Sequence, residues 1–143
     1  MTEPPFDIDA FLARPLTARV ATDGPTVRPT WFLWEGGAFW ILTGPWNRLL
    51  ARVRDDPAIA LVVDVCDIET GVVRLVIARG RADIVPFDVA RGRRKLRRYL
   101  GDDDTRWDPR FHDYLLADPA EKGNVWLRLV PSSLTARDLS YAV

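Results

Sequence analysis

The sequence contains one cysteine, one histidine and no long apolar run, and each scarcity excludes a class of protein. Because Cys66 is alone, no disulfide can form within the chain. Because His112 is alone, no cluster with zinc-ligand spacing exists, and a Ser-His-Asp or Cys-His arrangement would lack a nucleophile motif beside it. No segment approaches the roughly 20 apolar residues of a membrane span, and no signal peptide is recognisable. We therefore expect a cytoplasmic protein with no metal site and no membrane partner, in which His112 is structural or exposed.

Net charge is also missing, since 20 basic residues balance 20 acidic ones. A general nucleic-acid or anionic-membrane binder would carry a basic excess. The basic segment RGRRKLRR, residues 91–98, is therefore interpreted as the solvated outer face of a helix, balanced by Asp102 to Asp104, although a nucleic-acid contact is the alternative. The acidic segment GDDDT, residues 101–105, is interpreted as a solvated loop. No glycine-rich phosphate loop of standard spacing is present.

Aromatic residues are abundant, with six Trp and six Phe in 143 residues of which 48% are hydrophobic. A chain of this length can bury a real core, and we expect one domain over residues 1–143. The aromatic residues provide large buried area, and also enough surface for a flat ligand or a partner subunit.

Alternating apolar residues and turn signals predict about six strands, mostly joined by hairpins, and two or three helices. Pro29 cannot donate to a strand ladder, so it marks an edge or a bulge, and Gly80 predicts a bulge. The pattern is typical of a mainly β fold with inserted helices, an antiparallel barrel or sandwich that is α+β in the broad sense. Strands are expected over 16–22, 26–35, 38–43, 58–65 and 72–85 and from 124 into an extended tail; helices are expected over 6–15, 47–55 and 88–101.

Two of these expectations concern packing. The glycine pair at 36–37 predicts a hairpin that joins 26–35 to 38–43. The helix at 88–101 is expected to start at Asp88, to end at Gly101 and to pack through one apolar stripe. That stripe is expected to contain Val89, Gly92, Leu96 and Tyr99 or Leu100.

The segment TGPWNRLL, residues 43–50, is electrostatically unusual. Asn47 is suited to cap a helix, and Arg48 then lies in the first turn, where the helix dipole disfavours a cation. Arg52 lies one turn later on the same face, where like charges repel. Either Asp55, Asp56 and solvent balance these arginines or an anion completes the site, and a phosphate backed by Arg48 is the interpretation we favour.

Two tryptophans lie near this segment in the predicted sheet. Trp31 lies in the predicted strand 26–35, an edge or bulged strand whose backbone groups are free to meet a ligand, and Trp46 lies in the turn before the helix. Both could flank a planar ring, and the alternative is that both belong to the core.

Three stretches, residues 18–64, 76–85 and 125–139, resemble the pyridoxamine 5′-phosphate oxidase-like family, which includes flavin/deazaflavin oxidoreductases. The resemblance rests on the order strand, RP-x-W-F, glycine hairpin, strand, T-G, helix, R-x-D-P, strand. It implies an antiparallel Greek-key split β-barrel of the FMN-binding type. It also implies a homodimer with FMN or the deazaflavin F-420 at its interface.

The resemblance also assigns residues to the cofactor. Arg48 matches the arginine of a phosphate-binding Arg-Lys pair, whereas Leu49 stands where the lysine is expected. Thr30, Trp31 and Phe32 match the strand beside the ring, and Thr43 matches a hydroxyl near the phosphate. The expected cofactor-binding residues are Thr30, Trp31, Phe32, Thr43, Trp46, Asn47, Arg48 and Leu49.

The function implied is an oxidoreductase that acts on a small organic molecule by hydride transfer from the cofactor, with no catalytic side chain assigned. One alternative is a non-catalytic protein that stores a flavin, a haem or another planar ligand, and another is a purely structural partner protein. Oxidation of pyridoxamine 5′-phosphate itself is not expected, because the chain lacks a basic, histidine-bearing C-terminal segment.

Overall fold

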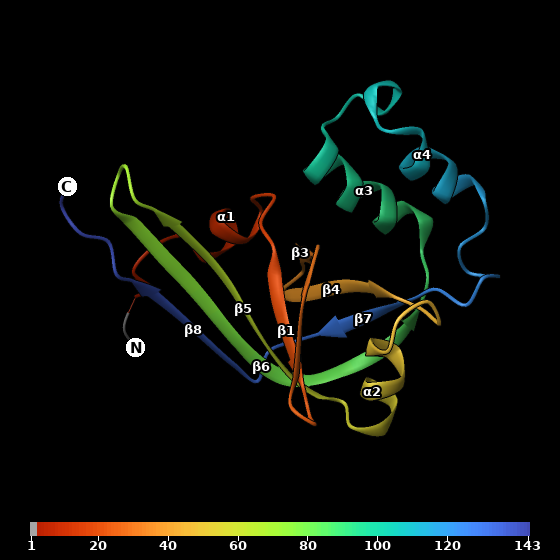
Figure 1. The fold of residues 1–143 in the computed structure, drawn as a ribbon, viewed down its shortest axis with the longest axis horizontal. Coiled ribbons are helices and arrows are strands. Elements are labelled where there is room, and N and C mark those ends of the chain that lie inside the picture. The colour runs from red at the N-terminus through yellow and green to blue at the C-terminus, as the bar shows by residue number, and fades with distance from the viewer. Residues whose placement is uncertain (1–2) are drawn as a thin grey trace.

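The computed structural model describes residues 3–143 and contains a mainly antiparallel sheet with helices on its periphery (Figure 1). The strands are β1 (Ala18–Thr22), β2 (Thr26–Thr30), β3 (Leu33–Glu35), β4 (Ala38–Thr43), β5 (Ala58–Asp67), β6 (Val72–Pro86), β7 (Val125–Leu129) and β8 (Ser133–Asp138). The helices are α1 (Ile8–Leu12), α2 (Leu49–Asp55), α3 (Val89–Leu100), α4 (Pro109–Leu116) and the 3-10 turn η1 (Asp104–Arg106). No helix within residues 3–143 has the length and apolar character needed to cross a membrane.

The strands follow the order β2-β1-β5-β6-β7-β4-β3, with β8 added beside β6. The two ends of this order, β2 and β3, do not pair with each other, so the sheet remains open. This arrangement confirms the predicted mainly β, antiparallel class. Buried side chains from both halves of the sheet meet in one apolar core, which includes Val20 and Val63 from β1 and β5 and Ile41 and Leu127 from β4 and β7.

The long strand β6 connects the two halves of the sheet. Its first part pairs with β5 and β8, and its last part, from Ala82, pairs with β7 (Figure 1). Gly80 lies between these parts and pairs in continuous register with Ile59, so the predicted bulge is wrong. A Cβ at Gly80 would lie 2.9 Å from Leu129 Cδ1. The glycine therefore permits a close approach and does not mark an inserted residue.

The expected strand 26–35 is interrupted between Thr30 and Leu33, so the predicted glycine hairpin is confirmed but its first strand is shorter than expected. β2 pairs with β1, and only the short β3 pairs with β4. The Tyr99 hydroxyl contacts both backbone groups of Phe32, at 3.0 Å from its nitrogen and 3.1 Å from its oxygen. These groups would otherwise need a strand partner, so the hydroxyl allows the break. The expectation that Pro29 lies at an edge is confirmed, because β2 ends the sheet order.

The C-terminal half differs from the prediction in two places. Residues 133–138 form β8 against β6 and are not simply an extended tail. Residues 102–122, for which no element was predicted, contain η1 and α4.

Helix α3 keeps its predicted ends, and its predicted apolar stripe is confirmed in part, since Gly92 and Leu96 are buried. Asp88 caps it by accepting a hydrogen bond from the Ala90 N–H, and Gly101 follows its last residue. Val89, expected inside, is 41% exposed, whereas Lys95 is buried. Lys95 follows Gly92 by three positions and directly precedes Leu96, so it lies on the same helical face as these two buried residues.

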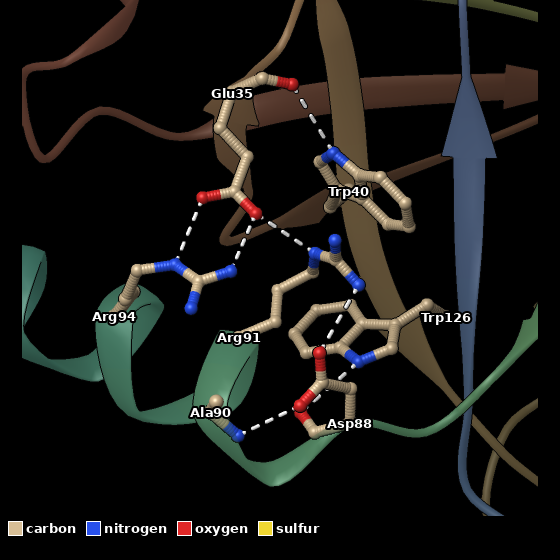
Figure 2. Close-up of polar contacts among 7 residues, drawn as sticks. All are labelled: Glu35, Trp40, Asp88, Ala90, Arg91, Arg94 and Trp126. Atoms are coloured by element: carbon tan, nitrogen blue, oxygen red, sulfur yellow. Dashed lines mark hydrogen bonds and ion pairs between the residues drawn. The ribbon is translucent and has the colours of Figure 1, made fainter.

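The basic residues of α3 are mostly not balanced by Asp102 to Asp104, which corrects that prediction. Arg93 pairs with Asp104, but Arg91 and Arg94 both pair with Glu35 of β3 (Figure 2). Arg94 holds Glu35 through two hydrogen bonds, of 3.0 and 2.8 Å. The hydrogen bond from Arg94 lowers the pKa of Glu35, and the bond from Arg91 adds to that effect. These contacts hold α3 against the β3–β4 end of the sheet.

Candidate functional site

Three arginines line one pocket between β1, β2 and α2. The pocket has a volume of about 250 Å³. Its lining contains no acidic residue, and none of the ion pairs within residues 3–143 includes these arginines. The residues that line this arginine pocket are Val20, Thr22, Thr26, Val27, Arg28, Arg48, Leu49 and Arg52.

The register of β1 and β2 brings the polar side of this pocket together. Thr22 lies opposite Thr26, and Val20 lies opposite Arg28. Directly opposed residues, and residues two apart on one strand, share a face of the sheet. The Thr22 and Thr26 hydroxyls consequently hydrogen-bond each other on the same face as Arg28.

Arg52 reaches from α2 to the turn between β1 and β2. Its Nη1 lies 3.6 Å from the position that a Cβ would occupy at Gly24. Arg48 lies one helical turn earlier and is exposed. The two arginines therefore approach the pocket from one side of α2, and Arg28 approaches it from the sheet.

The start of α2 differs from the prediction by one residue. The helix begins at Leu49, and Arg48 occupies the cap position without making a side-chain cap bond. Asn47 still performs the capping, because its Oδ1 accepts from the Leu49 N–H at 3.0 Å and from the Thr43 hydroxyl at 2.8 Å. Thr43 is fully buried, so its hydroxyl orients Asn47.

Trp46 and Leu49 lie on opposite sides of this turn. Trp46 is 59% exposed, and its indole N–H donates to Asn124 Oδ1 at 2.6 Å. Leu49 is 3% exposed and belongs to the main core. The alternative that both tryptophans are core residues therefore does not hold for Trp46.

None of the predicted ring-binding residues Thr30, Trp31 and Phe32 lines the arginine pocket. Trp31 stacks on Tyr99, with ring centroids 4.3 Å apart, and lines a second cavity that shares no residue with the first. Phe32 is fully buried in the core, and the Thr30 hydroxyl donates to the Trp31 carbonyl at 3.2 Å. Of the eight predicted residues, only Arg48 and Leu49 line the arginine pocket, and their grouping around one cofactor stays a prediction.

Thr22, Thr26 and Arg28 of the pocket were not among the residues predicted from the sequence, and Arg52 was noted beside Arg48 but not assigned to the cofactor. Thr26 and Arg28 alternate on one strand, and Arg52 follows Arg48 by one turn, so a signal for each pair was present. Thr22 carries no comparable signal. What the sequence did not indicate is that the β1–β2 hairpin packs beside α2 and joins the two pairs.

A family model described as pyridoxamine 5′-phosphate oxidase matches residues 6–129. No curated protein matches the chain.

Solved structures resemble this fold over nearly its whole length. A conserved hypothetical protein from Mycobacterium tuberculosis is 20% identical, with a TM-score of 0.72, and the match covers 96% of this chain and 88% of that one. An F-420 reductase is 24% identical, with a TM-score of 0.65 and coverage of 92% and 98%. An FAD-binding protein from Mycobacterium smegmatis is 20% identical, with a TM-score of 0.58 and coverage of 93% of each chain. At these identities the likeness is one of fold, and it confirms the predicted split-barrel class.

Proposed function

Since the chain belongs to the pyridoxamine 5′-phosphate oxidase family, we propose that it is a flavin- or deazaflavin-dependent oxidoreductase that acts on a small organic molecule. The observation that carries this proposal is the arginine pocket, in which Arg28, Arg48 and Arg52 gather without an ion pair to any carboxylate of residues 3–143. Three guanidinium groups beside one cavity repel one another, and a bound anion would relieve that repulsion.

The chemistry of the pocket fits the phosphate end of such a cofactor. Guanidinium groups bind phosphate oxygens in a bidentate manner, and the Thr22 and Thr26 hydroxyls add donors. A volume of about 250 Å³ is smaller than the roughly 300 Å³ at which whole-ligand pockets begin. We therefore assign the phosphate and its adjoining chain to this pocket and the ring to the surface outside it.

FMN and F-420 both remain candidates for this cofactor. Relatives of the same fold named F-420 reductase and FAD-binding protein support a flavin or deazaflavin. Such a group supplies hydride transfer when it is bound, and the protein supplies binding, orientation and electrostatics. Leu49 replaces the expected lysine with a buried apolar side chain, and Arg28 and Arg52 supply the positive charge that the lysine would have provided.

We further propose that two chains form a homodimer around the cofactor ring. Strand β2 ends the sheet order beside the arginine pocket, and its Val27 is 69% exposed. An exposed edge strand with an apolar side chain is a surface that a second chain commonly covers. Sedimentation equilibrium tests this proposal, and a monomer at all micromolar concentrations would contradict it.

The phosphate assignment is tested by titrating FMN and F-420 into matched arginine variants. Arg48→Ala and Arg52→Ala each remove one charged contact, which should weaken binding about 10- to 100-fold. Arg54→Ala serves as the control, because Arg54 is an exposed residue of the same helix outside the pocket lining. Equal affinities in all three variants would refute the assignment.

A non-catalytic carrier of a flavin or haem is the second candidate. The arginine pocket supports this function as well, because it accounts for the binding of an anionic group and assigns no residue to catalysis. Turnover distinguishes the two functions. An oxidoreductase consumes the reduced cofactor when it is offered a panel of enones and quinones, whereas a carrier binds the cofactor without consuming it.

A further inference from the structure

A second cavity lies between the sheet and the helices α3 and α4, and we call it the α3–α4 cavity. It has a volume of about 150 Å³, and aromatic side chains form much of its wall. Phe87 and Trp126 stack in parallel there, with centroids 5.6 Å apart and an interplanar angle of 5°. Its lining residues are Trp31, Leu42, Phe87, Gly92, Lys95, Leu96, Phe111, Tyr114, Leu115 and Trp126.

Lys95 brings an ammonium group into this apolar cavity. The side chain is only 7% exposed, and its Nζ lies 5.6 Å from the centroid of the Trp126 ring. None of the ion pairs within the described part of the chain includes Lys95. Burial lowers the pKa of Lys95 to about 8, with a smaller contribution from the Arg98 charge, so the amine is still mostly protonated at neutral pH. A buried cation without a carboxylate is costly, and a negatively charged ligand would offset that cost.

Tyr114 supplies a second free donor in the same wall. Its hydroxyl is buried and has no hydrogen-bond partner within residues 3–143. Burial raises the pKa of this phenol to about 12, so it keeps its proton at neutral pH. The cavity wall thus holds an ammonium group without an ion-pair partner and a phenol without a hydrogen-bond partner within residues 3–143, while buried polar atoms in native proteins nearly always have partners.

We propose that the α3–α4 cavity binds a small aromatic carboxylate of about the size of benzoate. Its carboxylate would accept hydrogen bonds from Lys95 and Tyr114, and its ring would contact the aromatic wall. A cavity of this volume accepts one benzene-sized ring, and a three-ring flavin is too large for it. The inference is independent of the cofactor proposal, because the α3–α4 cavity and the arginine pocket have no lining residue in common.

Gly92 keeps the cavity open. It lies inside α3, where glycine is unfavourable relative to alanine. A Cβ at this position would lie 3.2 Å from both Leu115 Cδ2 and Phe87 Cζ, which is tighter than ordinary contact. The Gly92→Ala variant therefore fills part of the cavity with one methyl group while it favours the helix.

The test is a benzoate titration of the purified full-length chain, followed by calorimetry and tryptophan fluorescence, since Trp31 and Trp126 line the cavity. Benzamide is the uncharged probe of nearly equal size. Lys95→Met should weaken benzoate binding at least about tenfold and change benzamide binding by less than about threefold. Gly92→Ala should weaken both probes. Lys122→Met, at the exposed second lysine of the chain, is the matched control and should change neither.

Two results would overturn the proposal. One is the absence of saturable benzoate binding to the wild-type chain at millimolar concentration, and the other is equal benzoate affinity in wild type and Lys95→Met. A crystal structure of the wild-type chain with benzoate provides a test that needs no variant. A carboxylate within hydrogen-bond distance of Lys95 Nζ supports the proposal, and benzoate bound only elsewhere refutes it.

Discussion

Replacing Lys95 by methionine should stabilise the protein, which is unusual for a change at a buried position. The substitution keeps an unbranched side chain of similar length in the α3–α4 cavity and removes the buried charge. Lys95 is 7% exposed and has no carboxylate partner among the ion pairs of residues 3–143. The buried charge therefore lowers the free energy of unfolding of the wild type, and this penalty is absent in the methionine variant.

The size of the effect follows from the pKa of Lys95, which falls from 10.5 to about 8 in the folded chain. At about 1.4 kcal/mol for each tenfold change in proton affinity, protonated Lys95 lowers the stability by about 3 kcal/mol relative to neutral Lys95. Between the folded and unfolded pKa values the unfolded chain binds more protons, so the wild-type stability rises with pH in this window. Below about pH 8 the penalty is present in full.

Urea unfolding of wild type and Lys95→Met at pH 7 and pH 9.5 measures this effect. The stability advantage of the variant should be larger at pH 7, by about 2 kcal/mol. Arg98 and Tyr114, the other titratable groups near Lys95, are present in both chains, so their effects largely cancel in the comparison. Lys122→Met should show no such pH dependence. A difference between wild type and Lys95→Met that is the same at both pH values would refute the picture of Lys95 as a buried charge.

Three further predictions concern the stability of the fold. Glu35→Gln should lower the free energy of unfolding by about 1 kcal/mol in urea melts at pH 7, because it weakens the contacts with Arg91 and Arg94. Acid should cause the same loss in wild type: Arg94 lowers the pKa of Glu35, so this stabilisation is present above the usual value of 4.5 and disappears as the pH falls through the lowered value. Gly71→Ala should destabilise the chain by about 1–3 kcal/mol in thermal melts, since its φ is +73° and its Cβ would lie 2.1 Å from the Tyr141 carbonyl oxygen. Gly37→Ala has the same φ in open space, so it should cost less, and equal costs would disprove the role of the Tyr141 contact. Asp88→Ala should lower the helical stability of α3 by about 1 kcal/mol, measured by circular dichroism during unfolding, and no loss would show that the cap contributes nothing.

Local patterns in the sequence predicted most of the elements. Apolar, β-branched runs identified the long strands, Asp88 and Gly101 marked the ends of α3, and Pro29 marked an edge. These features depend on residues that are close in sequence, so they can be identified without the fold.

The errors arose where a distant residue determined the local structure. The break at Phe32 depends on the hydroxyl of Tyr99, which is 67 positions away in the sequence. The inward orientation of Lys95 depends on what α4 and the sheet place around it. Local propensity contains no information about such contacts, and charge alone suggested that Lys95 would be solvated.

The candidate site was predicted only in part for the same reason. Arg48 was identified from its position beside a helix start, and it does line a pocket. Arg28 belongs to the same pocket because the β1–β2 hairpin packs beside α2, which no local pattern indicates.

Equilibrium titration of the wild-type protein with FMN and with F-420 tests most directly our claim that the chain binds a flavin or deazaflavin. Changes in the absorbance and fluorescence of the cofactor report binding, and mass spectrometry identifies any chromophore that remains bound after purification. We predict saturable binding of at least one of the two cofactors. A colourless protein that binds neither FMN nor F-420 would contradict the claim.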